Sequence, residues 1–271
     1  MKTLLLALAT PLTLAVAPLV TPAPLTASIQ DVQKPIDELY ADHYTNQDAD
    51  AMAKAWSANE PRVLGTIDAD LEASLAIWEQ AMSRDEPGLN DEERAEIAMR
   101  HQRALFGARA ATAAFDRPIF LDYTSAFVSW NAEQKESFRA GQAAFRDAVG
   151  ALGKQDWEAA RDAAQECADL AQPLGDWWGT AMGLGALGAV EAQLGNHSAA
   201  LSALGQSRLL NAGLGLRGAE RRDLQIMLGV LQESGQTQRA LAVLDDLLTD
   251  ARGEEQKMLE QQRLALVHAG L

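Results

Sequence analysis

The sequence predicts an all-α protein built from stacked helix pairs. Three observations support this fold class. Ala, Leu, Glu, Gln and Arg dominate from Asp31 onward. No segment shows the sustained two-residue alternation that a half-buried strand needs. A similar helix–turn–helix corner recurs at a fixed interval in the second half of the chain. We therefore expect roughly eleven helices of ordinary length joined by short loops, and no β-sheet.

Residues 1–27 have the pattern of a secretory signal peptide. Lys2 is the only charge, Leu4–Val20 is a largely apolar run, and small residues at Ala23 and Ala27 offer cleavage points. A membrane anchor is the alternative, but two prolines interrupt this run and make it a poor spanning helix. We expect cleavage after Ala27, a secreted or periplasmic location, and no membrane association afterwards.

The charge balance limits the classes of partner. The chain has 23 Lys and Arg against 38 Asp and Glu, a formal net charge of −15. Such an acidic surface repels nucleic-acid phosphates and anionic lipids, so neither is an expected partner. The acidity is suited to solubility and, at most, to a cationic partner.

Residues 28–130 are predicted to form an N-terminal helical region that could contain degenerate repeats. Asn90 with Glu93, and Asn131 with Gln134, fit the reciprocal N-terminal cap of a helix. Asp48 is placed to open a second helix after a corner. Pro- and Gly-containing breaks are expected at three places: residues 60–65, 85–90 and 116–122.

The corner is in register three times in residues 131–271. Three alanines stand at equal spacing, namely Ala160, Ala200 and Ala240. A corner residue lies five places before each of them: Gln155, Gly195 and Gly235. A small residue at a helix crossing lets two helices approach closely, so we expect each Ala to be buried there. Cys167, seven places after Ala160, shares its helix face and is predicted to be a buried packing residue rather than a reactive thiol.

The segment "LGALGAVEAQLGNHSAALSAL" (184–204) carries a family resemblance. Leu187 and Gly188 match the first-helix signature of the tetratricopeptide repeat, Gly195 the corner and Ala200 the second helix. The chain resembles this family, in its long form of about 40 residues, over residues 131–252. The resemblance implies a right-handed α-solenoid of antiparallel helix pairs.

In this family the first helices of successive pairs line a concave groove that commonly binds peptides or segments of partner proteins. By register, the resemblance places eight residues in the groove, with Gln232 beside them: Met182, Gly185, Ala189, Gln193, Arg222, Gln225, Gly229 and Glu233. Arg222 is the main candidate for a polar contact with the partner, unless it pairs with a neighbouring Asp or Glu. Trp177 and Trp178 are adjacent, so they point to different faces, and one of them is a further candidate.

The long-repeat relatives often hold a peptide backbone with Asn side chains, which "LGALGAVE" (184–191) lacks. A structural array that packs against a partner by its surface is therefore an alternative to peptide binding.

No motif indicates catalysis. The four histidines are far apart in the sequence: His43, His101, His197 and His268. There is no Gly-rich phosphate loop and no G-x-S-x-G elbow. Asn46, Asp48 and Asp50 begin like a calcium loop, but Ala51 stands where Gly is required. We therefore predict no catalytic residue, no metal and no cofactor.

The leading hypothesis is an exported interaction module or scaffold that binds a protein or peptide segment and is not an enzyme. The alternative is an all-helical enzyme whose site is formed by residues far apart in the sequence. A deep polar pocket with strongly shifted titrating groups would favour the enzyme, and an open groove without such groups would favour binding.

Overall fold

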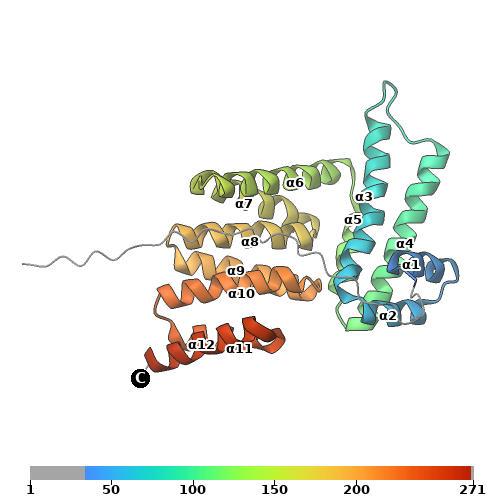
Figure 1. Ribbon diagram of the computed structural model, residues 1–271. Coiled ribbons are helices and arrows are strands. Elements are labelled where there is room, and N and C mark those ends of the chain that lie inside the picture. Colours follow the sequence, from blue (N-terminus) through green and yellow to red (C-terminus); the bar gives the residue numbers. More distant parts are fainter. Residues whose placement is uncertain (1–33, 270–271) are drawn as a thin grey trace, which may run out of the picture. The chain divides into compact units, whose positions relative to one another are not determined.

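Every regular element in the residues that the computed structural model describes, 34–269, is a helix. The predicted all-α class is confirmed for this part of the chain (Figure 1). None of these helices is long and apolar enough to cross a membrane. The predicted signal peptide, with its cleavage site after Ala27, lies outside the described residues.

The first five α-helices form the N-terminal part of the fold. They are α1 (Ile36–Thr45), α2 (Ala49–Ala58), α3 (Val63–Met82), α4 (Asp91–Phe115) and α5 (Ile119–Ser129), with a 3-10 turn, η1 (Glu60–Arg62), before α3. Helices α3 and α4 run side by side in Figure 1 and pack against each other. The predicted loop at residues 85–90 is confirmed, and so is the cap in which Asn90 accepts from the Glu93 amide at 2.8 Å.

Two of the predicted breaks are shorter than expected. Helix α3 already begins at Val63 and α5 at Ile119. Pro61 lies in the first positions of η1, and Pro118 precedes the first residue of α5. Proline is tolerated at these places because the first amides of a helix have no intrahelical partner.

The remaining α-helices follow one another with short corners. They are α6 (Ala132–Gly153), α7 (Trp157–Ala171), α8 (Trp177–Gln193), α9 (His197–Gly213), α10 (Arg217–Glu233), α11 (Thr237–Asp250) and α12 (Gly253–Ala269), with a 3-10 turn, η2 (Gln172–Leu174), after α7. Each packs against the next, and Figure 1 shows them as successive layers. The predicted cap at the start of α6 is confirmed, since Asn131 accepts from the Gln134 amide at 2.9 Å.

The corners occur twice as often as the spacing of Ala160, Ala200 and Ala240 suggests, because one lies between each pair of the predicted corners. Helices α7 to α11 begin at residues 157, 177, 197, 217 and 237, which are evenly spaced. Each corner has a residue in the left-handed region: Gln155, Gly175, Gly195, Gly215 and Gly235. The next amide donates to the carbonyl five positions earlier, at 2.8–3.2 Å, which satisfies the helix end. Gln155 adopts the same conformation as the glycines, with φ of 59°.

The predicted corner between α1 and α2 has the same geometry. Gln47 has φ of 53°, and the Asp48 amide donates to the His43 carbonyl at 2.9 Å. The Asp48 side chain accepts from the Ala51 amide at 3.0 Å and so caps α2.

Small residues allow the helices of the second half to pack closely. The three alanines of the repeat are fully buried, as predicted: Ala160, Ala200 and Ala240. A side chain at Gly183 would place its Cβ 2.7 Å from the backbone nitrogen of Ala168, and one at Gly188 would meet Leu204 at 2.5 Å. These positions exclude any larger residue because the neighbouring helix occupies the space.

Helices α1–α12 belong to one compact unit. Every second corner of the series α7–α11 packs against the N-terminal helices α1–α5. Leu174 and Leu214, at equivalent positions of successive repeats, are buried in the aromatic-rich core of the N-terminal helices. The Trp130 indole donates to the Leu174 carbonyl at 2.9 Å. The corners at Gly195 and Gly235 instead have open space around the glycine. Within the described residues, the N-terminal helices therefore cover one end of the helix pairs and leave the other end free.

Candidate functional site

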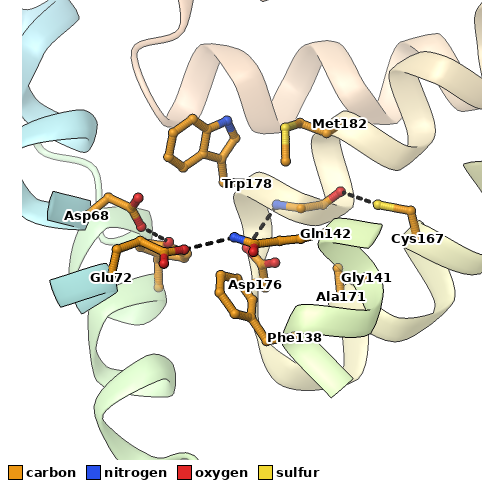
Figure 2. Close-up of a pocket in the computed structure, with 12 residues that line it drawn as sticks. Asp68, Glu72, Phe138, Gly141, Gln142, Cys167, Ala171, Asp176, Trp178 and Met182 are labelled. Atoms are coloured by element: carbon orange, nitrogen blue, oxygen red, sulfur yellow. Dashed lines mark hydrogen bonds between the residues drawn. The ribbon is translucent and has the colours of Figure 1, made fainter. Parts of the chain in front are cut away.

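A cavity of about 260 Å³ lies where α3 and α5 meet α6, α7 and α8 (Figure 2). Three carboxylates line it, namely Asp68, Glu72 and Asp176. Its other walls are formed by Tyr123, Phe138, Gly141, Gln142, Cys167, Ala171, Trp178, Gly179 and Met182. Residues from distant parts of the sequence therefore share one small space.

Asp176 is the N-terminal cap of α8. Its Oδ1 accepts from the Gly179 amide at 2.8 Å, as expected of an Asp that opens a helix. Asp176 is only 4% exposed. Burial raises the pKa of this carboxyl to about 7, and the charges of Asp68 and Glu72 act in the same direction, against the hydrogen bond from Gly179.

Asp68 faces the cavity from α3. Burial raises the pKa of its carboxyl to about 6, and the nearby charge of Glu72 adds to this effect. The Tyr123 hydroxyl donates to Asp68 Oδ1 and partly offsets the rise. Burial also raises the pKa of Tyr123 well above its usual value, so this phenol stays protonated as a hydrogen-bond donor.

Glu72, one helical turn after Asp68, is paired. Arg139 Nη1 lies 2.8 Å from Glu72 Oε2, and Gln142 Nε2 donates to Glu72 Oε1 at 2.8 Å. Arg139 also binds Glu79 at 2.6 Å. Within residues 34–269, no Lys, Arg or His forms an ion pair with Asp68 or Asp176. The cavity therefore has two carboxylates without an ion pair in this part of the chain: Asp176 is buried, and Asp68 is partly buried, with its pKa lowered somewhat by the charge of Arg139.

Two of the predicted partner-binding residues, Trp178 and Met182, line this cavity. The residues at the equivalent positions one repeat earlier also line it. Phe138 precedes Trp178 by one full repeat, and Gln142 precedes Met182 in the same way. All four belong to the first helices of successive pairs, α6 and α8. The register that placed Met182 in the groove would also have found Gln142, had it been extended back by one unit.

The other predicted candidates lie elsewhere. Five of them are exposed to solvent: Gln193, Arg222, Gln225, Gln232 and Glu233. Arg222 forms no hydrogen bond or ion pair with the described residues, although its charge lowers the pKa of the adjacent Asp223. Glu233 Oε2 lies 3.6 Å from His197 Nε2.

Gly185 lies against a buried polar network. A side chain there would place its Cβ 3.0 Å from Ser207 Oγ. Asp223 accepts from Ser207 at 2.8 Å and from Asn211 at 2.9 Å. Burial raises the pKa of Asp223, although both hydrogen bonds oppose the rise. This network joins α9 to α10 under the predicted groove.

Trp177 and Trp178 face different hollows, as their adjacency predicted. Trp178 lines the cavity, whereas Trp177 lines an open surface hollow of about 400 Å³ between the start of α5 and the end of α9. Ile119 and Leu210 are among the apolar residues of this second hollow. Both tryptophans are partly buried.

Cys167 is buried against the following helix, as predicted. It is 1% exposed, and its Sγ donates to the Gly179 carbonyl at 3.6 Å. Burial raises the pKa of the thiol to about 11. Because the thiolate is the nucleophile, we expect this thiol to react slowly at neutral pH.

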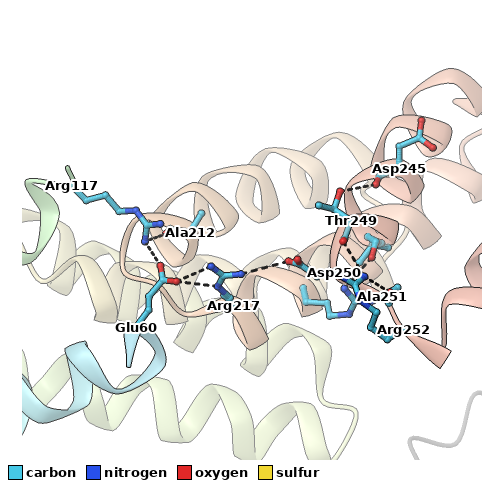
Figure 3. A network of polar contacts seen from close by, with 11 residues as sticks. Glu60, Arg117, Ala212, Arg217, Asp245, Thr249, Asp250, Ala251 and Arg252 are labelled. Atoms are coloured by element: carbon cyan, nitrogen blue, oxygen red, sulfur yellow. Dashed lines mark hydrogen bonds and ion pairs between the residues drawn. The ribbon is translucent and has the colours of Figure 1, made fainter. Parts of the chain in front are cut away.

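A polar network centred on Glu60 fixes the N-terminal helices against the repeats (Figure 3). Arg117 Nη1 and Arg217 Nη2 each lie 2.7 Å from a carboxylate oxygen of Glu60. Arg117 also donates to the Ala212 carbonyl at 3.2 Å. Burial opposes ionisation of Glu60, but the hydrogen bonds from Arg217 and Arg117 outweigh it and lower the pKa. The start of α3 is thereby held beside α9 and α10, which helps to position Asp68 over the cavity.

The described residues contain no group of three or more His, Cys, Asp or Glu placed to hold a metal ion. No protein-family model matches the chain, and neither a curated protein nor a solved structure is significantly similar to it.

Proposed function

We propose that this protein is an exported interaction module that binds a segment of a partner protein along the face formed by α6, α8 and α10. In this proposal, α6–α12 form a right-handed α-solenoid of the tetratricopeptide type. The sequential packing of the helices and the even spacing of their corners support it. The signal-peptide pattern of residues 1–27 supports export.

One observation carries the proposal. Two pairs of repeat-equivalent positions, 138 with 178 and 142 with 182, line a single cavity. The first helices of two successive pairs therefore share a hollow surface, which is what a continuous binding groove requires. Arg222 is the equivalent of Met182 in the next repeat and extends this series as an exposed cation. An exposed Arg without a partner among the described residues can bind a carboxylate or a carbonyl of a bound chain.

Site-specific photocross-linking tests this function. A photoreactive side chain at Gln225 or Gln193 should trap one protein in an envelope extract, because both positions lie on first helices. The same group at Gln206, exposed on the second helix α9, is the matched control and should trap nothing specific. Equal labelling from all three positions would contradict a groove on the first helices.

A double variant makes the test quantitative. Arg222→Ala with Gln225→Ala should leave the melting temperature nearly unchanged, since both side chains are exposed. Trapping from Gln193 should fall in this background. Undiminished trapping in the folded double variant would show that α10 does not contribute to the binding surface.

An acid–base enzyme is a second candidate, and it is favoured by shifted titrating groups, the feature that we expect of an enzyme. Asp68 and Asp176 have raised pKa values, about 6 and about 7, in the same cavity. Carboxyls with such values are suited to general acid and base catalysis near neutral pH. Hydrolysis of chromogenic glycosides, esters or phosphates that disappears in both Asp68→Asn and Asp176→Asn would favour the enzyme over the binding module.

A further inference from the structure

We propose that the cavity receives a basic side chain of the partner segment, a lysine ammonium or an arginine guanidinium on its aliphatic stem. This inference rests on the proposed function and specifies the chemistry of the partner: the bound segment is basic.

The cavity contains carboxylates that form no ion pair with the described residues. Glu72 is paired with Arg139, whereas Asp68 and Asp176 have hydrogen bonds only from neutral groups, and Arg139 acts on Asp68 only through its charge. Burying an ionised carboxylate without a cation is costly, and a cation that enters the cavity removes that cost. The cations of the neighbouring helix are already engaged. Arg139 binds two glutamates, and Lys135 lies over the Trp78 ring at 4.8 Å.

The size and walls of the cavity carry the second step. Its volume of about 260 Å³ is just below the range of about 300–1,000 Å³ found for small-molecule sites, so it suits one side chain rather than a whole cofactor. Phe138, Trp178 and Met182 provide apolar and aromatic surface. Such surface accommodates the stem of Lys or Arg, and an aromatic face attracts the charged head. Figure 2 shows the carboxylates of Asp68 and Asp176 in the same space as Phe138 and Trp178.

The charge of the whole chain carries the third step. A net charge of −15 attracts a basic segment over a distance and repels an acidic one. Arg222 is compatible with this partner, because an Arg can bind backbone carbonyls or the carboxyl terminus of a basic segment.

Binding of a cation should be linked to pH. The charged and titratable groups around the two carboxyls are Glu72 on α3, Tyr123 on α5, Arg139 on α6 and Cys167 on α7. The cation favours the ionised forms of Asp68 and Asp176. Affinity should therefore rise as the pH rises, by at least about tenfold between about pH 5.5 and about pH 7.5.

The probe for the test is n-butylammonium, which reproduces the lysine side chain, with n-butanol as the uncharged control. Binding to the purified protein is followed by the amide and indole signals in NMR spectra. We expect saturable shifts of Trp178 with n-butylammonium and none with n-butanol. The isosteric variants Asp68→Asn and Asp176→Asn should each weaken binding at least about tenfold, because each removes one of two charges that face the ligand. Asp156→Asn, which changes the exposed cap of α7, is the matched control and should bind as the wild type does.

Equal shifts with n-butanol, or affinities unaffected by both substitutions and by pH, would overturn the proposal. The pH series and the n-butanol comparison use only the wild type, so the test stands even where a variant fails to fold. Absence of n-butylammonium binding together with specific trapping from Gln225 would sink this inference and leave the interaction module intact. Binding of n-butylammonium without any trapped protein would contradict the basic segment and indicate a free organic amine as the ligand.

Discussion

Replacing Asp176 by Asn should stabilise the protein at neutral and alkaline pH. Asn caps a helix about as well as Asp, so the hydrogen bond from the Gly179 amide can be kept. The substitution removes only the charge. Since Asp176 is 4% exposed and has no cationic partner among the described residues, its ionised form destabilises the folded state.

The size and sign of the effect follow from the pKa of about 7 in the folded protein against 3.8 for a free Asp. Because the folded pKa is the higher one, the folded state binds the proton more tightly than the unfolded state. The stability due to this proton is fully present below pH 3.8 and is lost as the pH rises to 7. The loss between pH 4 and pH 8 is at most about 4 kcal/mol, at 1.36 kcal/mol per unit of pKa.

Urea unfolding of the wild type and Asp176→Asn at a series of pH values measures this difference. We expect the variant to gain at least about 1.5 kcal/mol on the wild type between pH 4 and pH 8, even where relaxation of the site reduces the full effect. Asp68 and Asp176 repel each other when both are ionised, so loss of the Asp176 charge also favours ionisation of Asp68, which acts in the same direction. Asp156→Asn is the control. Asp156 caps α7 in the same way, through the Ala159 amide, but it is exposed, so its replacement should give a nearly constant difference.

A flat difference between wild type and Asp176→Asn across the pH range would refute the reasoning. In particular, if Asp176→Asn were less stable than the wild type by the same amount at pH 4 and at pH 8, the carboxylate would contribute to the fold only as an ordinary helix cap.

Three other predictions concern the repeat, the thiol and the leader. Ala200→Leu should lower the free energy of unfolding by about 1–3 kcal/mol, because Ala200 is fully buried at a helix crossing; an unchanged urea midpoint would mean that the space is not filled. Cys167 should react slowly with a thiol reagent in the native protein and readily after denaturation, and fast labelling of the folded chain would contradict its burial. The exported protein should begin at Ser28, as measured by N-terminal sequencing, and a chain that retains Lys2 would rule out the signal peptide.

The helix pairs could be predicted from the sequence because their determinants are local. The regularly spaced alanines, the corner residues and the two Asn caps each depend on neighbours within one turn or on the next helix. The intermediate corners, at Gly175 and Gly215, were not predicted as members of the same series. The sequence does contain a signal for them, because a Leu-Gly pair recurs at Leu174–Gly175, Leu194–Gly195 and Leu214–Gly215, but the alignment on the alanines spaced by 40 residues passes over every second pair.

The cavity could be predicted only in part, because some of its residues come from helices that are far apart in the sequence. Trp178 and Met182 were candidates from the repeat region, but Asp68 and Tyr123 belong to helices without a recognisable repeat. Nothing near Asp68 in the sequence distinguishes it from the rest of the 38 acidic residues. Only the packing of α3 and α5 beside α6 and α8 places it at the cavity.

The position of the cavity also follows from the meeting of repeat and N-terminal helices. In the next unit, Gly218 and Arg222 stand where Trp178 and Met182 stand in this one, and both are exposed. A Cβ at Gly218 would meet no other atom within 4 Å, so no wall from the described residues closes over that position. At Trp178 and Met182, α3 supplies the missing wall together with Asp68 and Glu72. The repeat alone therefore provides an open face, and the N-terminal helices add an acidic wall that turns one end of it into a partly open cavity. Removing the charge of Asp68 should therefore change what enters the cavity without disturbing contacts at Arg222. The cavity and the open face around Arg222 can be tested separately.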